Sequence, residues 1–170
     1  LSLDERPHLP RALGSATFDG DGLATYAKPF VEKGELVSYV LGTYSGRKLG
    51  MPSTANAARG TSSPPSPATS NIDLTQGHLS RDALIAQMGT GLLVTSLIGS
   101  TINPTTGDYS RGASGFWVEG GQVKYPVNEC TIAGNLREML RSMIAANDAR
   151  AHLSTRVPSL LVEGLTLAGE

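Results

Sequence analysis

The sequence contains only one cysteine, Cys130, among its 170 residues. A single cysteine excludes an internal disulfide and any zinc site built from several cysteines. Histidine is also scarce, because only His8, His78 and His152 are present and no two lie one helical turn apart. That spacing would be needed for two histidines on one helix to reach the same zinc ion. We therefore interpret the histidines as surface or loop residues and predict no metal site in this chain.

Charge is low and almost balanced. Charged residues make up 17% of the chain, with 14 basic against 15 acidic side chains. A domain that binds nucleic acid or anionic lipid usually carries a basic patch and a net positive charge. The sequence also shows neither a signal peptide nor an apolar run of about 18 residues. We therefore expect no direct contact with nucleic acid, no membrane insertion and a cytoplasmic location.

Common catalytic motifs are missing as well. No serine lies in a Gly-x-Ser-x-Gly elbow, and Lys48 is not preceded by the glycine-rich cradle of a P-loop. Cys130 lies in an expected strand with no histidine nearby in the sequence, so we interpret it as a buried structural cysteine. One enzymatic alternative stays open, a hydrolase that uses Ser110 or Cys130 together with Asp108 or a distant histidine.

Short runs of strand-forming residues alternate with turns and predict a mostly antiparallel α+β fold. The clearest hairpin turns at Gly120-Gly121, and a second one turns at Lys33-Gly34. The run at 92–98 is apolar at nearly every position, which is typical of a strand buried on both faces. The expected strands are 26–32, 35–41, 71–74, 92–98, 115–119, 122–127 with an extension through 129–133, and 159–167.

Two or three helices complete this expected fold. The first covers 81–88, with Ser80 as its N-cap and Gly89 at its end. A second begins after Asn135, because apolar residues recur there on one helical face: Leu136, Met139, Leu140, Met143 and Ile144. Residues 42–50 fit one or two further helical turns. Residues 51–70, rich in Ser, Thr, Pro and Ala, predict a long exposed loop, and 99–109 predicts another.

The segment 106–117 concentrates small residues, two charges and two aromatics between two expected strands. Small residues let a second backbone approach closely, as an added peptide strand would require. Arg111 could receive a carboxylate, and Asp108 could cap a turn or meet an amine, although the two could instead pair with each other or brace the loop. The resulting candidates for a substrate cleft are Gly107, Asp108, Tyr109, Ser110, Arg111 and Gly112.

Several blocks of this sequence, taken in order, resemble the PmbA (TldE) branch of the TldD/PmbA family. The blocks are Tyr44-Ser45-Gly46-Arg47-Lys48-Leu49-Gly50, Met88-Gly89-Thr90-Gly91-Leu92, Gly107 to Ala113, Gly115 to Glu119, Tyr125-Pro126-Val127 and Thr131 to Leu136. Family members are described as peptide-maturing metalloproteases and as candidate modulators of DNA gyrase. The resemblance implies that residues 1–170 form a single domain like the family's C-terminal domain, without the preceding N-terminal domain, and built on a curved or barrel-like sheet.

The resemblance also implies how chemistry is divided between subunits. The TldD branch carries a His-Glu-x-x-x-His helix and a cysteine that bind zinc, whereas the PmbA branch lacks that set and pairs with TldD in a heterodimer. Cys130 does not lie where the TldD-type cysteine does, so the ligand role is not transferred to it. We therefore expect no catalytic residue and no cofactor in this chain, zinc in a TldD-type partner, and a peptide as substrate.

Two further expectations follow. The family's description as a gyrase modulator leaves open a binding module that acts on DNA gyrase or on a toxin–antitoxin pair without catalysis. A domain whose natural neighbours are another domain and a partner subunit should also expose apolar surface, so we expect self-association.

Overall fold

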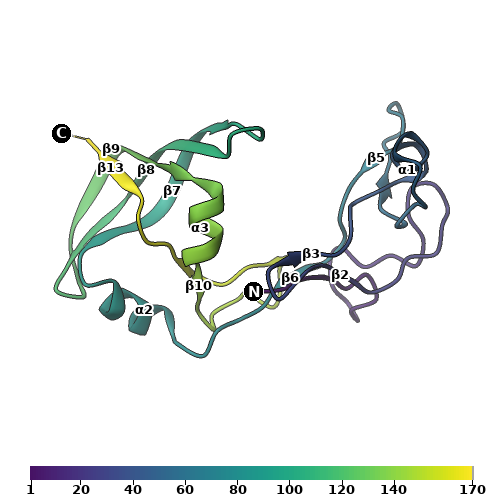
Figure 1. The fold of residues 1–170 in the computed structure, drawn as a ribbon. Coiled ribbons are helices and arrows are strands. Elements are labelled where there is room, and N and C mark those ends of the chain that lie inside the picture. The colour runs from purple at the N-terminus through teal and green to yellow at the C-terminus, as the bar shows by residue number, and fades with distance from the viewer. Residues whose placement is uncertain (170) are drawn as a thin grey trace. The chain divides into compact units, whose positions relative to one another are not determined.

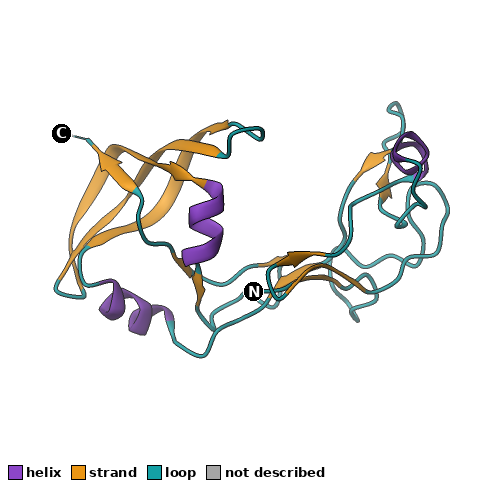
Figure 2. Cartoon of the chain, viewed as in Figure 1, coloured by secondary structure: helices purple, strands orange, loops and turns teal. Residues whose placement is uncertain are grey.

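The computed structural model describes residues 1–169, including the side chains of 1–99 and 102–169. These residues form three helices, α1 (Thr43–Leu49), α2 (Arg81–Met88) and α3 (Leu136–Ser142), and thirteen strands (Figures 1 and 2). The strands are β1 (Leu3–Glu5), β2 (Lys28–Glu32), β3 (Glu35–Leu36), β4 (Ala57–Ala58), β5 (Ser66–Pro67), β6 (Ile72–Leu74), β7 (Gly91–Ile102), β8 (Asp108–Glu119), β9 (Gln122–Asn135), β10 (Ile144–Ala145), β11 (Thr155–Arg156), β12 (Leu160–Leu161) and β13 (Thr166–Ala168). None of the helices is long and apolar enough to cross a membrane.

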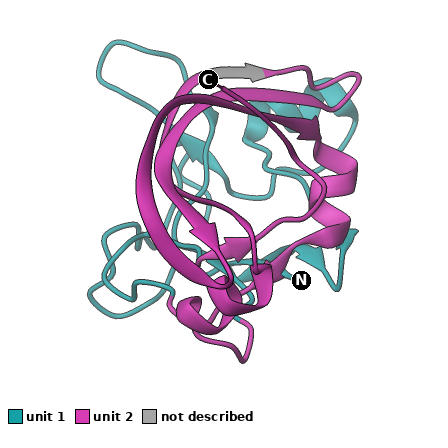
Figure 3. Ribbon diagram, turned by 90° about the vertical axis from the view of Figure 1, so that its left-hand side faces the viewer, with its two compact units in different colours: residues 1–76, 149–158 teal, residues 77–148, 159–170 magenta. Residues whose placement is uncertain are grey.

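The chain divides into two compact units, each made of two stretches of sequence (Figure 3). The first unit comprises residues 1–76 and 149–158, and the second comprises 77–148 and the residues from 159 onward. The first is built on a five-stranded sheet in the order β11-β6-β1-β2-β3, in which only the β11–β6 pair is parallel. Its buried apolar residues are few and several are small: Phe30, Leu41, Ala55, Ala57 and Ile72.

A buried polar network of Glu5, Lys28, Asn56 and Ser70 supplements this small core. The Glu5 carboxylate accepts hydrogen bonds from Lys28 Nζ at 2.6 Å, Asn56 Nδ2 at 2.8 Å and the backbone nitrogen of Ser70 at 2.7 Å. Burial by itself raises the pKa of Glu5, but the hydrogen bonds outweigh burial and hold that pKa below its ordinary value of 4.5. The network therefore ties β1 to β2 and to the ends of the segment that carries β4 and β5.

The second unit is built on a four-stranded antiparallel sheet in the order β13-β9-β8-β7. Its three main strands are 12, 12 and 14 residues long, and they curve visibly in Figure 3. β8 lies in the middle and is paired along its length with β7 on one side and β9 on the other. β7 and β13 form the two edges, so the sheet stays open.

Two clusters of buried side chains form the core of this second unit. One contains Ala113, Cys130 and Ile132 on the sheet, and the other joins Leu84 of α2 to Ala146 and Leu161. Helices α2 and α3 of this unit begin where the sequence predicts. The Ser80 hydroxyl accepts a hydrogen bond from the Ala83 nitrogen, and the Asn135 side chain accepts one from Arg137.

The predicted turns and helix starts are confirmed. Gly120 and Gly121 both adopt positive φ between β8 and β9, and Lys33 and Gly34 do so between β2 and β3. Helix α2 has the predicted bounds. Pro126 lies where β9 is paired only with β8, which agrees with its expected place at a strand edge.

Several predicted extents are wrong. The run at 92–98 is an edge strand with residues 94–98 exposed, because an apolar run does not reveal whether a neighbouring strand covers it. Residues 99–102 and 108–109, predicted as loop, continue β7 and begin β8. Helix α3 ends before Met143, whose backbone is extended, so Met143 and Ile144 are outside the helix. The expected strand 159–167 is split into β12 and β13.

The predicted exposed loop at 51–70 is ordered in part. It carries the short pair β4–β5, and Ala55, Asn56 and Ala57 within it are buried. The exposed stretch is confined to 58–64 and scattered positions on either side. Backbone hydrogen bonds explain this order, since the Ala68 nitrogen donates to the Asn56 carbonyl and the Gly20 nitrogen donates to the Ala57 carbonyl.

The predicted α+β class with mostly antiparallel pairing is confirmed, and the three helices agree with the expected two or three. The barrel-like alternative is wrong for the part of the chain that the structure describes. Its four sheets are separate and none of them closes on itself, because the β7 and β13 edges of the longest sheet do not pair with each other.

Candidate functional site

Five of the six predicted cleft residues lie at the start of β8, in the interior of the four-stranded sheet, and Gly107 lies in the loop just before it. Asp108 pairs with Asn135 of β9, and Gly112 pairs with both Ile98 of β7 and Thr131 of β9. Backbone groups of β8 are therefore already occupied on both sides, so a peptide strand cannot be added there. Strand addition at 107–112 is therefore excluded by the pairing of β8, and the edges of this sheet are β7 and the short β13.

Asp108 and Gly107 serve the local geometry of the loop before β8. The Asp108 carboxylate accepts a hydrogen bond from the Thr106 hydroxyl at 2.6 Å. Gly107 has a φ of 81°, and its carbonyl accepts a hydrogen bond from Leu136 at the start of α3. Asp108 forms no ion pair with Arg111 in the described chain, so the alternative in which these two charges pair is wrong.

The five candidates that lie in β8 are distributed over the two faces of the sheet, because side chains alternate along a strand. Tyr109 and Arg111 share a face with Ala113, which is buried in the core cluster with Cys130 and Ile132. Asp108, Ser110 and Gly112 occupy the opposite face. The sequence-predicted set therefore divides into three parts: Gly107 and Asp108 brace the loop, Tyr109 and Arg111 lie on the face of the core cluster, and Ser110 and Gly112 lie on the opposite face.

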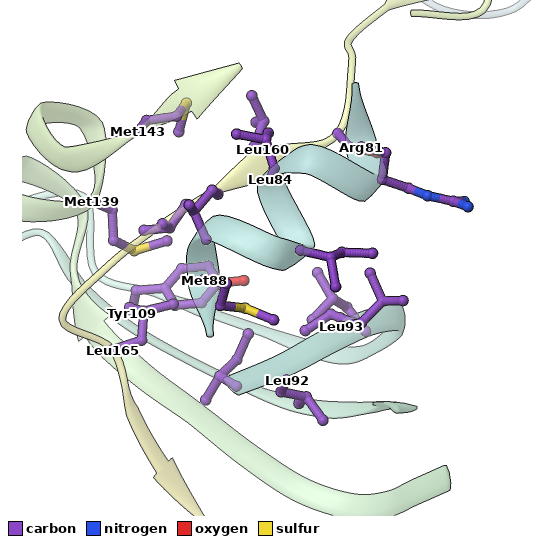
Figure 4. A pocket seen from close by; sticks show the side chains of 17 residues that line it. Arg81, Leu84, Met88, Leu92, Leu93, Tyr109, Met139, Met143, Leu160 and Leu165 are labelled. Atoms are coloured by element: carbon purple, nitrogen blue, oxygen red, sulfur yellow. The ribbon is translucent and has the colours of Figure 1, made fainter. Parts of the chain in front are cut away.

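An apolar pocket of about 390 Å³ lies on the Tyr109 face (Figure 4). This volume is within the range of small-molecule and peptide side-chain pockets. The lining residues come from α2, β7, β8, β9, α3 and the segment around β12: Arg81, Leu84, Ile85, Met88, Leu92, Leu93, Val94, Leu97, Tyr109, Ile132, Met139, Met143, Ser159, Leu160, Leu161, Val162 and Leu165. Three methionines among them can adapt to different occupants, because the unbranched thioether side chain is flexible.

The wall of this pocket at residues 159–162 is held by Asp148. Its carboxylate accepts hydrogen bonds from the backbone nitrogen and the hydroxyl of Ser159, both at 2.7 Å. Burial raises the pKa of Asp148, but the two bonds from Ser159 and the nearby charge of Arg81 outweigh burial and hold the pKa below its ordinary value of 3.8. Asp148 therefore stays ionised at neutral pH and fixes the start of the wall.

Arg111 is the unusual polar residue on this face. Its Nε is enclosed and has no hydrogen-bond partner in the part of the chain that the structure describes. An enclosed guanidinium nitrogen without an acceptor is destabilising, so such a group is normally matched by an anion or a carbonyl. The cross-strand neighbour of Arg111 is Ile132, which lines the pocket.

The groups that could hold a metal or act as nucleophiles are separate from this pocket. Cys130 is buried and its thiol donates to the Ala113 carbonyl at 3.1 Å, as the structural interpretation predicts. His8 contacts the Thr25 hydroxyl in the first unit. Within residues 1–169, no three His, Cys, Asp or Glu side chains come close enough to hold an ion. The donor set of this chain therefore does not fit the zinc ion that the resemblance implies for the family.

Sequence reasoning missed β7 as an open edge and as one wall of the pocket. Its 12 residues carry no charge, a signal that also fits a central strand. Met139 and Met143, which the sequence predicts as core packing, line the pocket together with Met88.

Comparison with known proteins reveals the relatives of this chain. A family profile described as the PmbA/TldA metallopeptidase C-terminal domain matches residues 1–169. The chain is 47% identical to the metalloprotease PmbA homolog of Haemophilus influenzae over 170 residues and 39% identical to the metalloprotease PmbA of Escherichia coli O157:H7 over 171 residues. These matches cover 99% and 100% of this chain but only 36% of each relative.

A solved structure agrees with these matches. The crystal structure of a candidate modulator of DNA gyrase from Bacteroides thetaiotaomicron superimposes with a TM-score of 0.87 and 36% identity. It covers 100% of this chain and 37% of that one, so the chain spans little more than a third of the proteins it resembles. The sequence blocks, the fold and these relatives together show that the chain belongs to the PmbA/TldD metallopeptidase family and corresponds to its C-terminal domain.

Proposed function

We propose that this chain is a peptide-binding domain that does not itself cleave, within a PmbA-type metalloprotease assembly. A TldD-type partner would supply the zinc ion, and the products would be matured or degraded peptides. The chain's own contribution is to bind and orient an extended peptide beside the metal-bearing subunit. The observation that carries this proposal is the position of β7, an uncharged open sheet edge that also forms a wall of the apolar pocket.

Strand addition to β7 suits this role physically. An edge strand presents unpaired backbone N–H and C=O groups, which give affinity for any extended peptide. Natural edges usually carry charges or proline that prevent such pairing, and residues 91–102 contain neither. Leu92, Leu93 and Val94 on this strand line the pocket, so an added peptide would lie beside a space that accepts an apolar side chain.

The metal-free part of the proposal is tested by metal analysis of the purified 170-residue chain after dialysis. We expect far less than one zinc per chain and no cleavage of an unstructured peptide, with cleavage appearing when a TldD-type subunit is added. Stoichiometric zinc in the chain by itself, or cleavage that persists after chelation, would contradict the division of labour.

The peptide-binding part is tested with a short unstructured peptide that carries an N-terminal fluorophore. Fluorescence anisotropy should show saturable binding, and Val94→Lys should weaken it by about tenfold or more because a charge would be placed at the pocket wall. Val123→Lys is the matched control, since Val123 is also exposed on a strand of the same sheet but does not line the pocket. Equal binding by both variants would refute β7 as the peptide edge.

A second candidate is a binding module for DNA gyrase, and the name of the Bacteroides thetaiotaomicron structure favours it. Direct contact with DNA is not part of this candidate, because the chain has a net charge of −1. A pull-down with purified gyrase at physiological salt distinguishes the two candidates. Retention of gyrase would support the module, and its absence together with peptide binding would leave the first proposal.

A further inference from the structure

We propose that the apolar groove between α2 and the open edge of β7 selects extended peptides that carry two large apolar side chains at alternate positions, in the pattern apolar-x-apolar. This inference rests on the proposed peptide-binding function and specifies its substrate class. The peptide would pair with β7 through its backbone. The two apolar side chains on one of its faces would enter the space beside Ile85 and Met88 of α2.

The unpaired backbone of β7 carries the first step. Among the described residues, the backbone of 91–98 pairs only with β8 and forms no other backbone hydrogen bond. Backbone groups of a strand point alternately to its two sides, so the groups that face away from β8 have no partner in this chain. An extended peptide satisfies such groups by adding as a further strand.

The contact between the apolar pocket and this edge carries the second step. Leu92, Leu93 and Val94 all line the pocket, although successive side chains of a strand point to opposite faces. A space that touches both faces of β7 passes along its free edge, because β8 occupies the other side. A peptide paired with β7 would therefore lie within the pocket, with its own side chains against the apolar lining.

Helix α2 forms the wall that faces this edge. Leu84 is buried in a cluster with Ala146 and Leu161, which anchors the helix through contacts outside β7. Ile85 and Met88 are only partly buried and line the pocket. Figure 4 shows α2 and β7 on either side of this space. Peptide side chains that turn toward the helix would therefore meet Ile85 and Met88.

The length of the apolar space determines the pattern that it selects. A second cavity of about 430 Å³ adjoins the pocket and shares Leu92 and Val94 with it. Together the two cavities follow β7 over residues 91–97, about 20 Å of extended strand. The charged residues in the two linings, Arg81 and Glu163, are exposed, so the rest of the lining favours apolar side chains.

The geometry of an extended strand then fixes the spacing. Side chains on one face of a strand recur at every second residue, about 7 Å apart. Apolar side chains at positions i and i+2 would therefore both enter the space along β7. Apolar side chains at positions i and i+1 would point to opposite faces, and one of them would stay outside.

The test compares peptides of identical composition on the 170-residue chain by fluorescence anisotropy. Each carries an N-terminal fluorophore and polar residues, with two leucines placed either at i and i+2 or at i and i+1. We expect the alternate-leucine peptide to bind about tenfold more tightly, since the adjacent-leucine peptide leaves one leucine exposed. N-methylation of every residue in the alternate-leucine segment should abolish binding, because the segment can then donate no backbone hydrogen bond.

Substitutions on α2 test the wall. Ile85→Ser should lower the affinity ratio of alternate to adjacent leucines by about threefold or more, and Ile85→Met should keep most of it. Gln87→Ser is the matched control and should keep the wild-type ratio, since Gln87 is exposed on the same helix and does not line the pocket. Both peptides are measured on each variant, so a change in stability leaves the ratio informative. An unchanged ratio in Ile85→Ser would overturn the role of α2.

Other outcomes separate this inference from the proposed function. Equal binding of the two leucine peptides by the wild-type chain would overturn the apolar-x-apolar pattern and leave peptide binding at β7 intact. Undiminished binding of the N-methylated peptide would overturn strand addition and both proposals with it. A dimer in light scattering, together with no binding of any peptide, would assign the β7 edge to a second copy of the chain and refute the peptide as its occupant.

Discussion

At the scale of single residues, the most consequential groups are polar side chains placed where the interior is otherwise apolar. Glu5 is 2% exposed and Lys28 is 7% exposed, and each is the ionic partner of the other. A buried pair contributes little net stability compared with an apolar pair, but removal of one partner leaves the other charge uncompensated. Neither residue could be assigned this role from the sequence, because the partners are 23 positions apart and an exposed pair would use the same residue types.

We expect Glu5→Gln to destabilise the first unit by roughly 3 kcal/mol at neutral pH, because the Lys28 ammonium would stay buried without a counter-charge. Urea unfolding followed by circular dichroism measures this difference. Glu32→Gln is the control, since Glu32 is exposed on β2 and should change stability by less than about 0.5 kcal/mol. Equal effects of the two substitutions would contradict the structural role of the network.

The same pair gives a pH prediction. The pKa of Glu5 is lower in the folded than in the unfolded chain, so its contribution is fully present above the ordinary value of 4.5 and is lost as pH falls through the folded value. The stability difference between the wild type and Glu5→Gln should therefore shrink as the pH is lowered below 4.5. A difference that stays constant down to pH values where the wild type unfolds would contradict the lowered pKa.

At the scale of elements, close approach of strands decides which glycines are replaceable. A Cβ on Gly115 would overlap the Leu93 carbonyl oxygen of β7, which is backbone and cannot rotate away. A Cβ on Gly112, three positions earlier on β8, would make an ordinary contact of 3.4 Å with Ile98. Gly115 is therefore required by the close approach of β7 and β8, whereas Gly112 has room for a methyl group.

We expect Gly115→Ala to destabilise the second unit by about 3 kcal/mol, since the added carbon would force β7 and β8 apart. Gly112→Ala should change stability by less than about 1 kcal/mol, because the site has room for a methyl group. Thermal unfolding of the two variants under identical conditions is the measurement. A more harmful effect at Gly112 than at Gly115 would mean that the β7–β8 approach is not as described.

At the scale of the whole molecule, several large apolar side chains are exposed to solvent. Exposed large apolar residues include Leu13, Phe18 and Tyr44 in the first unit and Ile98 in the second, each more than 60% exposed. The expected self-association and the TldD-type partner stay predictions, as do a single-domain organisation and the cleft role of residues 107–112. The open β7 edge gives a specific route by which a second copy could associate.

We expect Ile98→Lys to reduce self-association, because a charge on an uncharged edge strand opposes pairing with another strand. Light scattering over a concentration series should show a smaller average mass for this variant than for the wild type. Val123→Lys should leave the mass unchanged, because β9 near Val123 already carries Lys124. A wild-type chain that stays monomeric at high concentration would contradict the expectation itself.

The sequence by itself determined the features that depend on neighbouring residues: the turns at Gly120 and Lys33, the caps of α2 and α3, the α+β class and the family. Only the tertiary structure decided that 92–98 forms an edge, that β8 is enclosed on both sides, and that Tyr109 and Ile132 line an apolar pocket. The physical reason is that caps and turns are satisfied within a few residues. Edge position and pocket lining depend on pairings such as Leu97 with Ala113, which the local pattern cannot specify.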